Sequence, residues 1–188
     1  ANVDRQMQGA MKNEMLKPDT GVLLISEPFL NDSYFKRAVV LLSDHDEKGT
    51  LGFILNKPTD VNINDAVDDF PEFNAPLYFG GPVETDTLFY IHTIGKKLKG
   101  AKKIAEGIYW GGNYDQLKLM IDTGQVHPDM IRFYAGYSGW DPDQRNHELA
   151  QAVILDDEQE ANPLRFEIER KCMLILATQQ PAAGDLRT

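Results

Sequence analysis

The sequence is poor in cysteine and has no long apolar run. Cys172 is its single cysteine among 188 residues, which excludes an internal disulfide and a cysteine-based metal cluster. Beside the apolar run "MLILA", this residue is expected to be a small buried hydrophobe. No stretch approaches the roughly 18 apolar residues of a membrane span. The first fifteen residues also lack the apolar region of a secretory signal. We therefore expect a cytoplasmic protein without a membrane partner.

Positive charge is also in deficit, which bears on nucleic-acid binding. The chain has 19 Lys and Arg against 29 Asp and Glu, a net charge of −10. Because contacts with phosphate supply most non-specific affinity for DNA, this balance argues against direct DNA binding. One basic run, "KKLKGAKK" at 96–103, has neither an aromatic residue to stack on a base nor an arginine to read a guanine. We interpret it as a solvated loop.

Familiar catalytic and cofactor motifs are missing too. The chain lacks a dinucleotide-binding G-x-G-x-x-G, a phosphate-binding P-loop and a zinc-binding H-E-x-x-H. Ser138, in "GYSGW", does not fit a nucleophile elbow, because Trp140 stands where G-x-S-x-G requires its second glycine. The following Asp141 and Pro142 suit a helix start, so "GYSG" is predicted to be the turn from a strand into a helix. We expect no cofactor, no catalytic serine and no metal site.

Short apolar runs separated by turn residues make up most of the remaining chain. Strands are predicted at 21–26, 38–43, 50–56, 108–110 and 130–135, and as two runs within 76–93 that Gly80, Gly81 and Pro82 separate. The strands at 38–43 and 50–56 are expected to form a hairpin. Helices are predicted at 62–70 and from the cap Asn113 to a point just before Gly124. The second of these is expected to bury Leu117, Met120 and Ile121. Residues 1–20 are expected to form an N-terminal arm or helix, and 21–188 a single domain with an atypical C-terminal segment, 151–188.

Several motifs in fixed order resemble the bacterial YqgE/AlgH family. They include "GFILNKP" (52–58), "FGGPV" (79–83) and "IRFYAGYSGWDPDQ" (131–144), and the resemblance covers roughly residues 20 to 150. It implies an α+β fold, in which a mixed, strongly bent sheet forms a pseudo-barrel with helices packed outside. Asp143 and Arg145 depart from the family pattern, and the segment beyond Leu149 fits it poorly. The family has no established biochemical function, although some members carry the label of transcriptional regulator.

Two functional hypotheses follow, and the sequence leaves both open. The first is an uncharacterised cytosolic protein that binds without catalysis, with transcriptional regulation as the role that the family label suggests. Its partner is then an unknown protein or a small anionic ligand. The second is an enzyme with a small-molecule site near the turns at 56–58 and 80–82. For either hypothesis the candidate binding residues are His45, Asn56, Lys57, Gly80, Gly81 and His92.

The geometry of that site is itself a prediction. The motifs "ILNKP" and "YFGGP" are expected to be neighbouring strand ends that build one concave surface. Lys57 would then be a cation beside glycines that let an anionic ligand approach closely.

Overall fold

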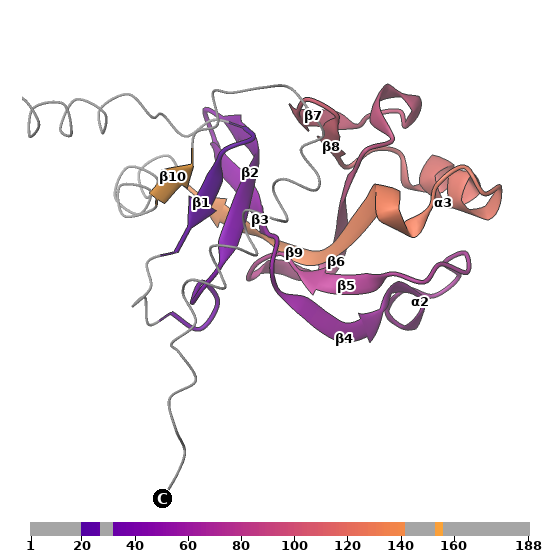
Figure 1. The fold of residues 1–188 in the computed structure, drawn as a ribbon, viewed down its shortest axis with the longest axis horizontal. Helices are drawn as coiled ribbons and strands as arrows, with labels where there is room; N and C mark the ends of the chain where they lie inside the picture. The colour runs from indigo at the N-terminus through magenta and orange to yellow at the C-terminus, as the bar shows by residue number, and fades with distance from the viewer. Residues whose placement is uncertain (1–19, 27–31, 142–152, 156–188) are drawn as a thin grey trace, which may run out of the picture.

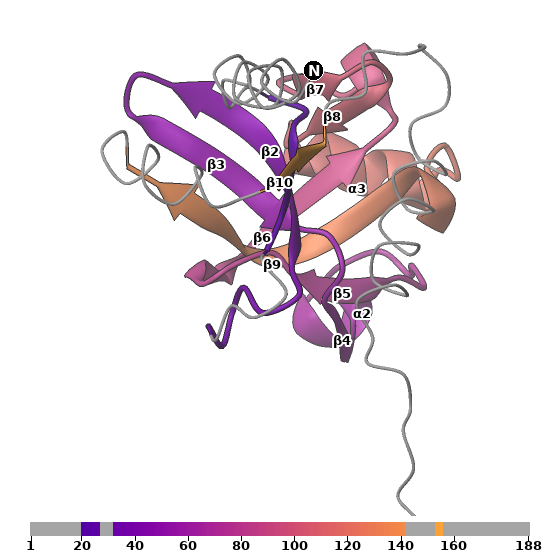
Figure 2. The same ribbon diagram turned by 60° about the vertical axis from the view of Figure 1, so that its left-hand side comes forward.

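The computed structural model describes residues 20–26, 32–141 and 153–155, which contain ten strands and two short α-helices (Figures 1 and 2). The strands are β1 (Leu23–Ile25), β2 (Val39–Asp46), β3 (Gly49–Ile54), β4 (Pro58–Asn62), β5 (Pro76–Phe79), β6 (Val83–His92), β7 (Lys102–Ala105), β8 (Ile108–Trp110), β9 (Ile131–Trp140) and β10 (Val153–Leu155). The helices are α2 (Ile63–Ala66) and α3 (Tyr114–Asp122), with 3₁₀ turns at Gly95–Lys97 and Pro128–Met130.

The strands form one strongly curled sheet in the order β10-β1-β2-β3-β9-β6-β8-β7. Strands that are adjacent in this order pair antiparallel. Outside this order, β5 pairs parallel with β9 and antiparallel with β4. The curl brings β7 back towards the opposite end, where Ile104 packs with Leu23 and Leu41. Lys102 of β7 also forms an ion pair with Asp44 of β2, at 2.6 Å. The sheet is therefore a half-barrel (Figure 2).

The predicted α+β pseudo-barrel is confirmed in its bent, mixed sheet. The prediction gave the helices too large a share of the fold. The described residues are mainly β, and α2 and α3 have four and nine residues. Both helices lie at the end of the molecule away from β1–β3, where they do not surround the barrel (Figure 1). There α3 packs Leu117, Met120 and Ile121 into a core cluster that includes Phe133 of β9. Neither helix of the described residues has the length and hydropathy of a membrane-spanning segment.

Local sequence signals explain where α3 begins and why α2 is short. The Asn113 side chain accepts a hydrogen bond from the Gln116 amide at 2.8 Å, which confirms the predicted cap of α3. By contrast, the predicted helix at 62–70 ends at Ala66. The Asn64 side chain bonds the carbonyls of Phe70 and Pro71 and the amide of Phe73, so it folds the chain back after one turn.

Other predicted elements have mixed outcomes. The hairpin of β2 and β3 is confirmed, with β3 ending at Ile54 rather than Asn56, and the break between β5 and β6 is also confirmed. The strands β4, β7 and β10 were not predicted, and β7 begins at Lys102, inside the run 96–103 that was interpreted as a loop. The expected arm at 1–20, a helix after Asp141, and the surroundings of Cys172 lie almost wholly outside the described residues.

Candidate functional site

The motifs "ILNKP" and "YFGGP" lie side by side, as predicted. The amide of Ile54 donates a hydrogen bond to the Gly80 carbonyl at 2.9 Å, and the amide of Phe79 donates to the Lys57 carbonyl at 2.8 Å. Further along, Pro58 of β4 pairs with Tyr78 of β5. We call this contact of residues 54–58 with 78–81 the strand junction.

The polar side chains of the strand junction bind backbone of the same chain. Asn56 Oδ1 accepts from the Val39 amide, and Asn56 Nδ2 donates to the Arg37 carbonyl, both at 2.8 Å. Lys57 Nζ donates to the Tyr34 carbonyl. Burial lowers the pKa of Lys57, and the nearby Asp32 carboxylate offsets part of that effect. These contacts hold the turn at 32–38 against the sheet.

The glycines of the strand junction accommodate the backbone of β9. A Cβ atom on Gly80 would lie 2.3 Å from the Gly136 carbonyl oxygen, and one on Gly81 would lie 2.2 Å from the Tyr137 carbonyl carbon and oxygen. Both Gly80 backbone groups are also bonded, the amide to Ala135 and the carbonyl to Ile54. The space beside these glycines is therefore filled by the protein itself.

Ser138 lies inside β9, so the prediction that "GYSG" is a turn is wrong. The strand continues to Trp140, and its residue Ser138 pairs with Gly52 of β3. Gly136 has φ of 71°, which bends the chain without ending the strand. The Ser138 side chain is completely buried, and its hydroxyl donates to the Gly80 carbonyl at 3.1 Å. This contact gives Ser138 a structural role at the strand junction.

Replacing Ser138 with alanine should lower the free energy of unfolding by about 1 kcal/mol. The substitution removes one buried hydrogen bond, and a typical bond of this kind contributes about that much. The Gly80 carbonyl keeps its bond from Ile54, so it is not left unsatisfied. Urea denaturation followed by circular dichroism measures the change, with the exposed Ser33→Ala variant as the control. A destabilisation above about 3 kcal/mol would contradict this simple account.

The two candidate histidines lie in other parts of the fold. His45 is on the β2–β3 hairpin, where its Nδ1 lies 2.8 Å from Thr50 Oγ1. His92 is at the end of β6, 2% exposed, with its Nε2 2.9 Å from the Gly111 carbonyl oxygen. Burial lowers the pKa of His92, and its bond to Gly111 opposes this in part. The six candidate residues thus lie in three separate places: the strand junction, the β2–β3 hairpin and the end of β6. The described residues contain no cluster of three His, Cys, Asp or Glu side chains suited to a metal ion.

A groove that the sequence did not predict lies beside the β2–β3 hairpin. It has a volume of about 480 Å³, and its lining comes from residues 44–46 and 48–51, from Val83, and from the end of β9 with Asp141. We call it the hairpin groove. The pairing of Thr50 with Trp140 brings these distant segments together. Because this pairing joins segments far apart in the chain, no local pattern indicated the groove.

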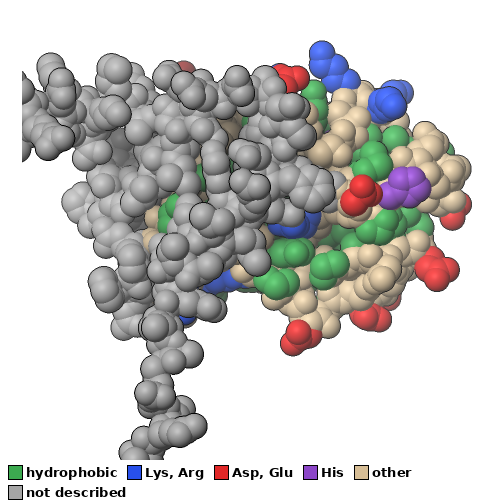
Figure 3. Space-filling view, in the orientation of Figure 1, with side chains coloured by type: hydrophobic (Ala, Val, Ile, Leu, Met, Phe, Trp, Pro, Cys, Tyr) green, Lys and Arg blue, Asp and Glu red, His purple; other side chains and the backbone are tan. Residues whose placement is uncertain are grey.

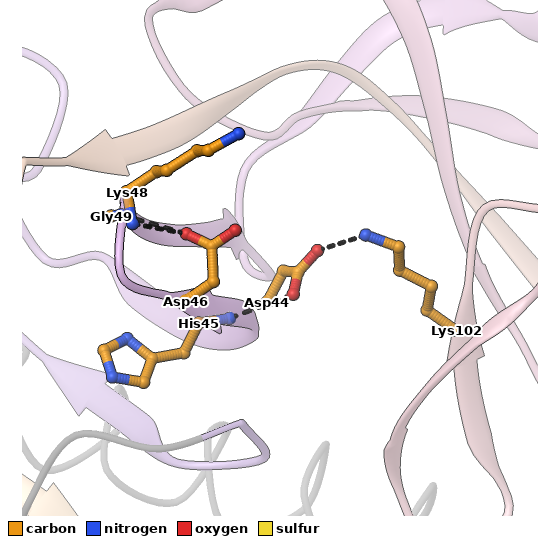
Figure 4. Close-up of polar contacts among 6 residues, drawn as sticks. All are labelled: Asp44, His45, Asp46, Lys48, Gly49 and Lys102. Carbon is orange, nitrogen blue, oxygen red and sulfur yellow. Dashed lines mark hydrogen bonds and ion pairs between the residues drawn. The ribbon is translucent and has the colours of Figure 1, made fainter.

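The lining of the hairpin groove includes acidic and aromatic side chains, together with the candidate residue His45. Asp44, Asp46 and Asp141 contribute carboxylates, and Tyr137 and Trp140 contribute aromatic rings. Asp46 caps the turn by accepting from the amides of Lys48 and Gly49 at 2.8 and 3.2 Å (Figure 4). Figure 4 also shows Asp44 reaching the Lys102 ammonium. Carboxylates near aromatic rings suit a cationic group.

The comparisons with known proteins identify the family. A model of the AlgH-like family matches residues 23–162. The chain belongs to the AlgH-like family. This match extends beyond Leu149, where the resemblance in the sequence was expected to end.

Members of the AlgH-like family from several bacteria are similar along most of their length. A UPF0301 protein of Chlorobium limicola is 43% identical over 75% of each chain. One from Bacteroides thetaiotaomicron is 43% identical over 85% of this chain and 81% of its own.

Two solved structures show the same fold. The AlgH protein of Pseudomonas aeruginosa has a TM-score of 0.62 at 24% identity, covering 90% of this chain and 99% of its own. The protein DIP2367 of Corynebacterium diphtheriae has a TM-score of 0.62 at 21% identity, covering 92% of this chain and 94% of its own. At these identities the likeness concerns the fold alone. The family establishes no biochemical function for this chain.

Proposed function

We propose that this protein is a non-enzymatic binding protein and that its hairpin groove receives a cationic segment of a protein partner. The observation that carries the proposal is the composition of the groove. Its volume is about 480 Å³, and three carboxylates and two aromatic residues are in its lining, against one lysine, Lys48, among the described residues. Asp44 pairs with Lys102 and Asp46 accepts from turn amides, whereas Asp141 is exposed. An arginine or lysine side chain satisfies both kinds of group, because it pairs with carboxylates and packs over aromatic faces.

The alternative, an enzyme at the strand junction, has less support. Such an enzyme needs polar groups that are free to bind or activate a substrate. At the strand junction Asn56 uses both its amide oxygen and its amide nitrogen on backbone groups, and Lys57 binds the Tyr34 carbonyl. The same contacts reduce the case for an anionic ligand at Lys57. The geometry therefore favours a cationic partner at the hairpin groove.

Any regulatory role would act through this protein contact rather than through DNA. The net charge of −10 repels the phosphate backbone. Within the lysine run, Lys102 pairs with Asp44 at 2.6 Å and Lys103 pairs with Glu106 at 2.7 Å, which reduces the charge available to phosphate. Lysine and arginine side chains are seen at the upper edge of the surface in Figure 3, near β7.

Removing the Asp141 carboxylate tests the proposal. Asp141 is an exposed residue in the lining of the hairpin groove, so Asp141→Asn should weaken binding of a fluorescent octa-arginine peptide by about fivefold, the effect of roughly 1 kcal/mol. Fluorescence anisotropy at physiological salt measures the dissociation constant. An octa-glutamate peptide should not bind.

The matched control removes the same charge elsewhere. Asp122 is an exposed residue at the end of α3, on the side of the molecule away from the β2–β3 hairpin (Figure 2). Asp122→Asn should change the dissociation constant by less than about twofold, because a distant exposed charge is largely screened. Equal weakening in both variants would show that net charge alone attracts the peptide, and it would overturn the hairpin groove as the binding site.

A further inference from the structure

We infer that His92 and the Gly111–Gly112 turn form an acid-sensitive latch that holds the start of α3 and the loop at 95–101 in place. The latch is defined by the hydrogen bond between His92 Nε2 and the Gly111 carbonyl, 2.9 Å long. A carbonyl oxygen can only accept, so Nε2 must carry the hydrogen. In the neutral ring, His92 Nδ1 is then a lone-pair acceptor.

The environment of His92 suits only its neutral form. The residue is 2% exposed, and its buried Nδ1 atom has no hydrogen-bond partner in the part of the chain that the structure describes. Protonation would add a second N–H that has no acceptor and place a positive charge in the interior, both of which cost free energy. The ring can relieve this cost by leaving its site, which breaks the bond to Gly111.

Among the described residues, the neighbours of His92 bring no carboxylate that would stabilise an imidazolium. From β8, the Tyr109 ring stacks on it with centroids 6.2 Å apart, and from β6 itself the Tyr90 ring lies at 6.1 Å. On β9, its partner in the strand pairing is the apolar Ile131. From α3, Tyr114 interacts with Tyr90, whose pKa burial raises to about 12.

The turn that His92 holds is connected to two further elements. The Tyr90 hydroxyl donates to the Gly112 carbonyl at 2.7 Å. The next residue, Asn113, caps α3, and its amide donates to the Lys99 carbonyl at 2.7 Å. Gln116 of α3 then bonds the Lys99 amide and the Lys97 carbonyl, both at 2.9 Å. Opening the latch would therefore loosen the start of α3 together with the loop that carries the lysines.

The direction of the pH effect follows from the pKa of His92. Burial lowers this pKa in the folded protein, whereas an exposed histidine has a pKa of about 6.5. The closed latch is thus fully stable above about pH 6.5. As the pH falls from there towards the lowered pKa, the open form takes up a proton that the closed form does not. Its population should rise by up to about tenfold per pH unit.

Amide hydrogen exchange of the full chain between pH 7.5 and 5.5 tests this inference. After correction for intrinsic exchange rates, the equilibrium constant for opening at amides 111–113 and 97–101 should rise below pH 6.5, by up to about tenfold for each pH unit. His92→Gln keeps a donor for Gly111 but does not titrate in this range, so its opening should be independent of pH. The exposed His127→Gln control should retain the response of the unmodified protein.

Nitrogen NMR of the histidine rings provides a second measurement that does not depend on a variant folding. It should show His92 protonated on Nε2 at neutral pH and titrating below an exposed histidine. A hydrogen on Nδ1, or an ordinary titration near pH 6.5, would overturn the latch. So would a pH response in His92→Gln equal to that of the unmodified protein.

Discussion

Replacing Gly136 with alanine is expected to lower the free energy of unfolding by about 4 kcal/mol or more, a large fraction of the stability of a typical domain. A Cβ atom there would lie 2.5 Å from the Gly81 carbonyl oxygen and 2.7 Å from that of Val83. Both are backbone atoms, so no side-chain rotation can relieve the overlap. The contact between β9 and the 81–83 segment would have to open, and β9 lies at the centre of the sheet.

Gly107 provides a matched control for backbone conformation. Its φ of 73° is nearly the same as the 71° of Gly136, but a Cβ atom on Gly107 would meet nothing within 4 Å. Gly107→Ala should therefore lower the free energy of unfolding by about 1 kcal/mol, because only the left-handed conformation disfavours alanine there. Urea denaturation followed by circular dichroism compares the two variants. Similar losses would show that φ alone requires glycine at 136, contrary to the close approach of the strands.

Replacing Asn56 with alanine should cost about 3 kcal/mol. The side chain satisfies the Val39 amide and the Arg37 carbonyl, and Val39 is only 1% exposed. Losing both bonds leaves a buried donor without a partner, and each unsatisfied buried group costs about 1–3 kcal/mol. Chemical denaturation measures the loss, and binding of the octa-arginine peptide to the remaining folded protein should be unchanged.

Asn56→Asp separates the two bonds. Aspartate keeps an oxygen for the Val39 amide but loses the donor to the Arg37 carbonyl, which would face a negative charge instead. We expect a loss of stability in this variant too, with the Val39 contact retained. Protection of the Val39 amide from exchange should therefore survive in the aspartate variant and fall in the alanine variant. A fully stable Asn56→Ala protein with altered ligand binding would instead support a functional role for the strand junction.

Elements governed by neighbouring residues were predictable from the sequence. The Asn113 cap, the buried face of α3 and the hairpin of β2 and β3 depend on contacts between residues close in the chain. The order of motifs such as "GFILNKP" and "FGGPV" also indicated the family, and with it the bent sheet. The side-by-side arrangement of these two motifs was predicted correctly because both end strands at glycine or proline.

Features that depend on distant segments were predicted wrongly or not at all. Composition made "GYSG" resemble a turn, yet β9 continues through it because residues from β3 and β6 supply hydrogen-bond partners on both sides. The helix at 62–70 is an exception, because contacts close in the chain cut it short: the Asn64 side chain bonds to residues 70–73. His92 was grouped with Asn56, although its contacts lie with β8 and the Gly111–Gly112 turn.

The sequence alone therefore determined the family, the approximate strands and the charge that disfavours DNA. Only the tertiary structure decided which polar atoms are already bonded and where a groove remains. A residue type states what hydrogen bonds a side chain can make, but its partners are chosen by strand pairing across the sheet. That pairing engages Asn56 and Ser138 with backbone groups, and it brings Asp44, Tyr137 and Asp141 around one groove.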